Sequence, residues 1–421
     1  MGRVGSQTAK SHVQRYEQVR TTLLHALSLV EEPRAMRHIL VCCILLCRAD
    51  SGAFAQVRSE TQQVPAAAPA LDPEYRRLDE LASILRARNE KQYAISSPKG
   101  ISESGYVTIG GIEQWVTIQG QNRDNPALLF VHGGPGDVTS SWSFALFAPW
   151  EWYFTIVQWD ERGSGRTLGK NGPGIAQTIT VDRMVQDGIE LTEYLRKHLH
   201  KEKIILVAHS FGSILGVRMA RAKPEYFYAY VGTGQVSDVP VKNYAATYEA
   251  LLKKAKSLDN QPAIEELSRV GPPPYNSGEG YRVQWQWANA FEGATGFLSG
   301  TLGLALAAPG YSVGDFKDHE DGQRLSADRL VPQTQSIGPA ELGLEFLIPI
   351  FVFQGEEDFT TSTVLAEHYV DSIKAPRKEF VAIKRGGHFA VFMRSDQFLE
   401  ELITRVRPLA AGHRPRPKTE S

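Results

Sequence analysis

The chain has 421 residues, of which 46 are Lys or Arg and 47 are Asp or Glu, so its formal net charge at pH 7 is −1. This balance argues against a nucleic-acid binder and against a polybasic membrane-surface protein. Hydrophobic residues make up 42% of the chain and aromatic residues 10%, which is enough for a well-packed globular core.

Residues 1–55 indicate an N-terminal extension that ends in a secretory signal peptide. The apolar run 39–47 holds all three cysteines and is too short to span a bilayer. It follows Arg34 and Arg37 and precedes a small-residue site that predicts cleavage after Ala55. We therefore expect a secreted or periplasmic protein, without stable membrane insertion after cleavage. The alternative is a buried N-terminal helix, in which case the protein is cytoplasmic.

A linker rich in Ala, Pro and Gln covers residues 56–73, and apolar residues at helical spacing then predict a helix to about Tyr93. The strands expected after it are 106–109, 114–118, 127–131, 153–159, 204–208, 228–232, 348–353 and 378–383. The helices expected between and after these strands are 180–199, 213–220, 363–373 and 392–405. This alternation predicts an α/β protein with a mostly parallel sheet covered by helices on both faces.

The alternation stops between residues 237 and 345, where helix-like pieces and Gly/Pro-rich joints replace it. We interpret 237–345 as a helical cap inserted between two parts of one core, 74–236 and 346–408. An independent second domain is the alternative. Residues 409–421 are polar and Pro-rich, which predicts a disordered tail.

The most specific local pattern is an apolar strand that runs directly into Ser210. Residues 204–208 form the strand, and a segment of helical spacing follows the serine. Strand, sharp turn and helix are the parts of a nucleophile elbow, which requires small neighbours. Gly212 meets this need after the serine, and Ala208 stands where the usual elbow has glycine. The N–H of Phe211, at the helix start, is then a candidate donor to an oxyanion.

An elbow serine needs a base and an acid that orients the base, in the chain order Ser, acid, His. Asp358 is the acid candidate, in the turn after the penultimate strand, with Glu356 and Glu357 as neighbours that could replace it. His388 is the base candidate, on a Gly-Gly loop after the last strand. His209 adjoins the serine, but its side chain should point away from the apex.

A second oxyanion donor is expected after an early strand. Residues 127–131 end in His132-Gly-Gly-Pro-Gly136, where the N–H of Gly134 or Gly133 can point at a developing negative charge. His132 is expected to hold this loop by hydrogen bonds.

These motifs resemble the prolyl aminopeptidase (proline iminopeptidase) branch of the α/β-hydrolases. The resemblance rests on His132-Gly-Gly-Pro-Gly136, on Trp159-Asp-Glu-Arg-Gly-Ser-Gly-Arg-Thr167 and on the serine elbow, and it covers residues 100–235 and 345–405. It implies an α/β-hydrolase fold with an inserted helical cap, and an acyl-enzyme mechanism that needs no cofactor and no metal. The catalytic residues that it implies are Ser210, His388 and Asp358.

The sequence departs from this family at further places. Glu161 stands where the family has Gln, and the family's Trp-x-x-Trp-Glu cap motif, near the acidic side chains that hold the substrate's free amine, is absent. The nearest counterpart is segment 285–292, in which Glu292 could bind the amine. Trp285 and Trp287 could line an apolar acyl pocket or simply form the cap's own core.

The leading prediction is a serine hydrolase that releases N-terminal proline, or a similar residue, from small peptides or amides. A carboxylesterase or lipase-like hydrolase of small esters, using the same residues, is the alternative. A non-catalytic binding protein on a hydrolase scaffold is a third reading. In each case the expected partner is a small molecule or a short peptide, and no nucleic acid.

Overall fold

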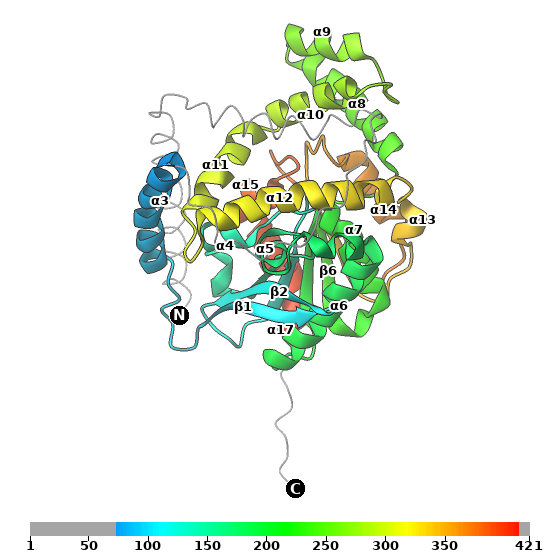
Figure 1. Cartoon of the computed structure of the whole chain (residues 1–421). Helices are drawn as coiled ribbons and strands as arrows, with labels where there is room; N and C mark the ends of the chain where they lie inside the picture. The colour runs from blue at the N-terminus through cyan, green and yellow to red at the C-terminus, as the bar shows by residue number, and fades with distance from the viewer. Residues whose placement is uncertain (1–72, 412–421) are drawn as a thin grey trace, which may run out of the picture.

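The computed structural model describes residues 73–411 (Figure 1). The expected extension, the apolar run 39–47, the cleavage site after Ala55 and nearly all of the linker lie outside this range, as do all three cysteines. In the described range, none of the helices combines the length and the apolar character that a membrane span requires.

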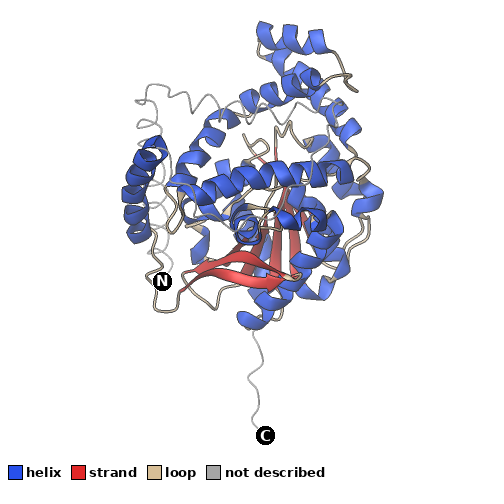
Figure 2. Cartoon of the chain, in the orientation of Figure 1, coloured by secondary structure: helices blue, strands red, loops and turns tan. Residues whose placement is uncertain are grey.

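A single eight-stranded sheet lies at the centre of the described part, with helices on both sides of it (Figure 2). The strand order is β1-β2-β4-β3-β5-β6-β7-β8, and every pair is parallel except β1 with β2 and β2 with β4. The strands are β1 (Ile101–Ile109), β2 (Ile112–Gly120), β3 (Ala127–Val131), β4 (Thr155–Trp159), β5 (Ile204–His209), β6 (Phe227–Thr233), β7 (Ile350–Gly355) and β8 (Lys378–Ile383). The predicted mostly parallel α/β sheet is confirmed.

Two core clusters, one on each face, hold the sheet between its helices. In β3, Leu129 and Val131 belong to one cluster, while Leu128 and Phe130 belong to the other. Alternate residues of a strand point to opposite faces, so a strand covered on both sides must be apolar throughout. This explains why the central strands read as continuous apolar runs.

The first cluster is covered by α6, α7 and α14, and the second by α4, α15 and α16. The helices outside the cap are α3 (Pro73–Gln92), α4 (Ser140–Leu146), α5 (Gly165–Asn171), α6 (Val181–His198), α7 (Phe211–Ala222), α14 (Thr363–Ser372), α15 (Ala390–Met393), α16 (Ser395–Glu401) and α17 (Arg407–Ala411). Short 3-10 turns lie at Trp150–Trp152, Pro173–Thr178, Pro224–Tyr226 and Val331–Thr334, and a π turn at Leu402–Val406.

Between β6 and β7 the chain is helical. The helices of this interval are α8 (Pro240–Ser257), α9 (Gln261–Val270), α10 (Gly278–Phe291), α11 (Ala294–Leu306), α12 (Val313–Leu330) and α13 (Pro339–Leu342). Figure 1 shows α8, α9 and α10 on the far side of α12 from β1 and β2. These three helices share a small core of their own, which Phe359 of the main body joins.

The C-terminal region differs from the expectation in two ways. One continuous helix over 392–405 was expected, but Arg394 takes a non-helical conformation (φ −126°, ψ 40°) and separates α15 from α16. The expected tail begins at residue 409, yet α17 continues to Ala411 because Leu409 and Ala410 pack on the second core cluster.

Candidate active site

Ser210 stands alone between β5, which ends at His209, and α7, which begins at Phe211. Its backbone has φ 53° and ψ −125°, a strained conformation for a residue other than glycine. The turn is held by the Ser210 N–H, which donates to the Thr233 carbonyl at 3.0 Å, and by the N–H of Ser213, which donates to the Ser210 carbonyl at 2.9 Å. The strand–turn–helix geometry predicted for an elbow is present.

The structure brings three of the predicted site residues into one hydrogen-bonded row. His388 Nε2 lies 3.0 Å from Ser210 Oγ, and His388 Nδ1 lies 3.1 Å from Oδ2 and 3.2 Å from Oδ1 of Asp358. The three residues come from the ends of β5, β7 and β8, which are neighbours in the sheet apart from the intervening β6. Asp358 and His388 are both buried.

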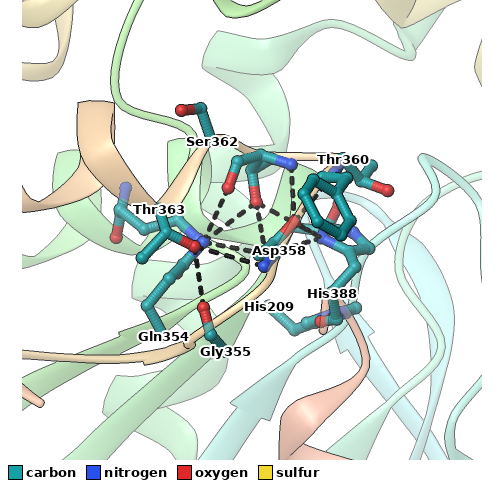
Figure 3. A network of polar contacts seen from close by, with 12 residues as sticks. His209, Gln354, Gly355, Asp358, Thr360, Ser362, Thr363 and His388 are labelled. Carbon is teal, nitrogen blue, oxygen red and sulfur yellow. Dashed lines mark hydrogen bonds and ion pairs between the residues drawn. The ribbon is translucent and has the colours of Figure 1, made fainter. Parts of the chain in front are cut away.

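The carboxylate of Asp358 is fixed by donors from its own turn and from the end of β7, as Figure 3 shows. Oδ2 accepts from Gln354 Nε2 at 2.8 Å and from the Thr361 hydroxyl at 2.9 Å. Oδ1 accepts from the backbone N–H groups of Thr360 at 2.9 Å and Thr361 at 2.7 Å. Both oxygens are therefore satisfied, and the carboxylate has one defined orientation toward His388.

The alternative acids and the alternative base have other partners. Glu357 pairs with Lys254 of the cap at 2.5 Å, and Glu356 accepts from the N–H of Arg385 at 3.3 Å. His209 donates from Nε2 to the carbonyl of His388 at 3.0 Å, and burial lowers the pKa of His209 to about 3. His209 is thus a neutral support for the backbone of His388. Apart from its proximity to Ser210, nothing in the sequence indicates this role.

Burial acts to lower the pKa of His388, but the charge and the hydrogen bond of Asp358 outweigh it, so that the pKa lies above its ordinary value. A buried imidazole with this partner is a better proton acceptor than one in water. The row can accept the proton of the Ser210 hydroxyl on Nε2 while Nδ1–H donates to Asp358.

The loop His132-Gly-Gly-Pro-Gly136 lies directly against the serine turn. A Cβ added to Gly133 would lie 2.8 Å from Ser210 Cβ, and Gly134 has a φ of +113°. His132 Nδ1 contacts the Gly133 carbonyl at 3.1 Å. The N–H of Phe211 belongs to the first turn of α7, where backbone donors have no intrahelical acceptor. The loop and the helix start therefore approach Ser210 from two sides, as a pair of oxyanion donors requires.

Glu161, the residue that departs from the family pattern, is completely buried. Neither of its carboxylate oxygens has a hydrogen-bond partner in the described structure, and Oε1 lies 3.8 Å from His132 Nδ1. Burial raises the pKa of Glu161 well above its ordinary value and lowers that of His132 to about 4. Burial therefore favours the uncharged form of both groups.

The two arginines of the segment 159–167, which also holds Glu161, form ion pairs that connect parts of the protein. Arg162 Nε pairs with the buried Asp187 at 2.6 Å, and its NH2 group donates to the Gly110 carbonyl of the hairpin. Arg166 pairs with Asp315 of α12 at 2.7 Å. The loop after β4 is thereby tied both to the hairpin and to the cap.

The three cap residues proposed for substrate binding lie in different surroundings. Trp287 donates to Glu266 at 2.9 Å and packs on the cap's own core, whereas Trp285 is 41% exposed. Glu292 lies beside the row: Oε1 accepts from the N–H of Phe359 at 2.8 Å, and Oε2 from the N–H of His388 at 2.6 Å. Burial and the nearby charge of Asp358 raise the pKa of Glu292 to about 8.

An aromatic group that the sequence did not reveal adjoins His388. Phe389 lies 5.1 Å from the ring of His388, and Phe297 of α11 lies 5.5 Å from Phe389. Phe392 and Trp142 lie 5.8 and 6.4 Å from Phe297. Phe389 follows His388 directly in the chain, but nothing in the sequence pairs it with a residue of the cap. These rings give His388 apolar surroundings.

Over residues 73–411 no group of three or more His, Cys, Asp or Glu side chains is arranged to hold a metal ion. The functional groups that the described side chains bring together are the hydroxyl of Ser210, the imidazole of His388 and the carboxylate of Asp358.

Comparison with known proteins agrees with this architecture. A model of the "Alpha/beta hydrolase family" matches residues 128–401. The chain belongs to the alpha/beta hydrolase family. Among curated members similar to this hydrolase, the probable aminopeptidase YbaC of Bacillus subtilis is 26% identical over 301 residues, covering 70% of this chain and 93% of the relative.

One further curated relative and one solved structure are similar to this chain. The proline iminopeptidase of Saccharolobus solfataricus is 28% identical over 189 residues, which is 44% of this hydrolase and 58% of the relative. The crystal structure of the proline iminopeptidase-related protein TTHA1809 from Thermus thermophilus matches with a TM-score of 0.53 and 22% identity, covering 74% of this chain and 100% of that one. The structural likeness concerns the fold.

Proposed function

We propose that this hydrolase works through an acyl-enzyme formed on Ser210. The observation that carries the proposal is the row Ser210–His388–Asp358, with 3.0 Å between the hydroxyl and the imidazole and 3.1 Å between the imidazole and the carboxylate. Ser210 Oγ attacks the substrate carbonyl while its proton passes to His388 Nε2. The N–H groups of Phe211 and Gly134 stabilise the negative oxygen that forms.

The second half of the reaction uses the same groups. The tetrahedral intermediate collapses, the bond between the carbonyl carbon and the leaving group breaks, and His388 gives its proton to that leaving amine or alcohol. Water then attacks the acyl-enzyme, His388 takes one of its protons, and Ser210 is released with its own proton restored. Asp358 keeps the imidazole in the required tautomer throughout.

The substrate class that we propose is a short peptide or amide with N-terminal proline or a similar residue. The names of the curated relatives support it, since they are an aminopeptidase and proline iminopeptidases. The alternative, hydrolysis of small esters, is favoured by the aromatic rings of Phe389 and Phe297 beside the base, because such rings suit an apolar acyl group.

A panel of substrates tests both proposals. Prolyl, alanyl and leucyl anilides are compared with p-nitrophenyl acetate and butyrate, and Ser210→Ala serves as the control for background hydrolysis. We expect turnover of the prolyl anilide with the highest kcat/KM among the amides. Ester turnover without any amide turnover would reject the aminopeptidase assignment and leave the esterase.

A further inference from the structure

Glu292 makes contacts that no substrate-binding role explains. It caps the C-terminus of α10, and Gly293, with a φ of +67°, then turns the chain into α11. From this joint in the cap its carboxylate reaches the main body of the protein. One oxygen accepts from the N–H of Phe359, next to Asp358, and the other from the N–H of His388 itself.

The two acceptor bonds join segments that are far apart in the chain. Glu292 is 67 residues from Phe359 and 96 residues from His388. One bond is therefore made to the turn that carries the acid and the other to the loop that carries the base. Each oxygen of the Glu292 carboxyl group accepts one backbone N–H, so a single side chain fixes the spacing of the two loops.

The base loop is shaped to let this carboxylate approach. A Cβ added to Gly387 would lie 2.4 Å from Oε2, 2.5 Å from Cγ and 2.7 Å from Cβ of Glu292. The φ of Gly387 is not in the left-handed region, so its backbone does not itself require glycine. The absence of a side chain at residue 387 is explained by the close contact with Glu292.

We propose that Glu292 is a positioning residue, whose carboxylate holds the acid turn and the base loop in register and couples both to the α10–α11 joint of the cap. The proposal rests on the proposed function, in which Asp358 and His388 act together. It differs from an amine anchor: a positioning residue serves every substrate, whereas an anchor serves only substrates with a free α-amine.

The two roles predict different kinetics for Glu292→Ala. If Glu292 positions the loops, kcat falls by the same factor, ~10²-fold, for prolyl anilide and for p-nitrophenyl acetate, because misplacement by about 1 Å costs about that much. The KM of each substrate stays within about twofold of the wild-type value, since no substrate contact is lost. Active sites are counted by titration with a fluorophosphonate, so that kcat refers to competent enzyme only.

Three variants sharpen the test. Glu292→Gln should recover only part of the loss, because its amide oxygen accepts one N–H while its NH2 group faces the other. Gly387→Ala should lower kcat for both substrates by displacing the carboxylate. The losses should be less than additive in the double variant, since the added methyl group then meets only the Cβ of residue 292 and no carboxyl group. Glu279→Ala removes an exposed cap carboxylate that pairs with Arg269 and serves as the matched control.

The results separate the inference from the function on which it rests. A loss confined to the free-amine substrate, or fewer titratable sites with an unchanged kcat per site, overturns the positioning role of Glu292. Fully additive losses in the double variant also overturn it. Full activity in Ser210→Ala would instead overturn the proposed function, whatever Glu292 does.

Discussion

Glu161→Gln should make the protein more stable, and increasingly so as the pH rises. The side chain is completely buried with both carboxylate oxygens unpaired, and its neighbour His132 has a pKa of about 4 and is neutral at pH 7. Burial raises the pKa of Glu161 well above 4.5, so the folded protein binds a proton there that the unfolded chain releases. Glutamine has the same shape and no proton to release.

The size of the effect follows from linkage. A carboxyl group with a raised pKa contributes stability that is fully present below the unfolded pKa and is lost as the pH rises toward the folded one. Each pH unit removes about 1.4 kcal/mol while Glu161 stays protonated in the folded state. From pH 4.5 upward the advantage of the Gln variant should therefore grow, by at most about 1.4 kcal/mol for each pH unit.

Urea unfolding of both proteins at several pH values between 4.5 and 8 measures this difference. Glu249→Gln, at an exposed position of α8, is the matched control and should show the same pH profile as wild type. The contribution of His132 is common to both proteins and cancels. A difference between Glu161→Gln and wild type that is flat across the pH range would refute the reasoning, because it would mean that Glu161 is ionised in the fold.

Three further outcomes follow from the site. Asp358→Asn should lower kcat by ~10⁴-fold through loss of the correct imidazole tautomer, whereas Glu357→Gln should change kcat less than about twofold; the reverse ranking in steady-state assays would move the acid by one position. Gly133→Ala should lower kcat by ~10²-fold or more, because the added Cβ would lie 2.8 Å from Ser210 Cβ, and an unchanged kcat would separate the loop from the reaction. The acid limb of the kcat/KM profile should have its midpoint above 6.5, since activity requires neutral His388 and its pKa is raised, and a midpoint below 6.5 would contradict this.

The strand–turn–helix around Ser210 could be predicted because its geometry is local. The apolar strand, the small flanking residues and the start of the helix all lie within about fifteen consecutive residues. Asp358 and His388 could be placed because loops at the carboxyl ends of parallel strands meet at one edge of a sheet. The row of Ser210, His388 and Asp358 could therefore be predicted from strand positions and chain order alone.

Contacts between the cap and the core could not be predicted in the same way. Helix α12 is highly polar, and among its buried residues are Gly322 and Ser326, which lie against the loop that holds Gly163. Close packing of small residues leaves no apolar periodicity to detect. The hydrogen bonds that Glu292 accepts from Phe359 and His388 likewise depend on how the cap packs on the core.

The helix expected over 392–405 shows that breaks within a helix could not be predicted from the sequence pattern. The apolar spacing identifies the buried face but does not register the break at Arg394 or the π turn at Leu402–Val406. Helix propensity and apolar periodicity are properties of several consecutive residues. A break at one non-helical residue depends instead on tertiary contacts, and here Phe392 and Phe398, on either side of the break, pack in one cluster.

The most direct test of the account is the site of covalent labelling by a fluorophosphonate, mapped by mass spectrometry of the digested protein. We expect one adduct, on the peptide that carries Ser210, and no adduct in folded Ser210→Ala. Labelling that is slowed in His388→Ala would agree with the imidazole as the base. An adduct on another residue, or equal labelling of wild type and Ser210→Ala, would contradict the central claim that Ser210 is the nucleophile.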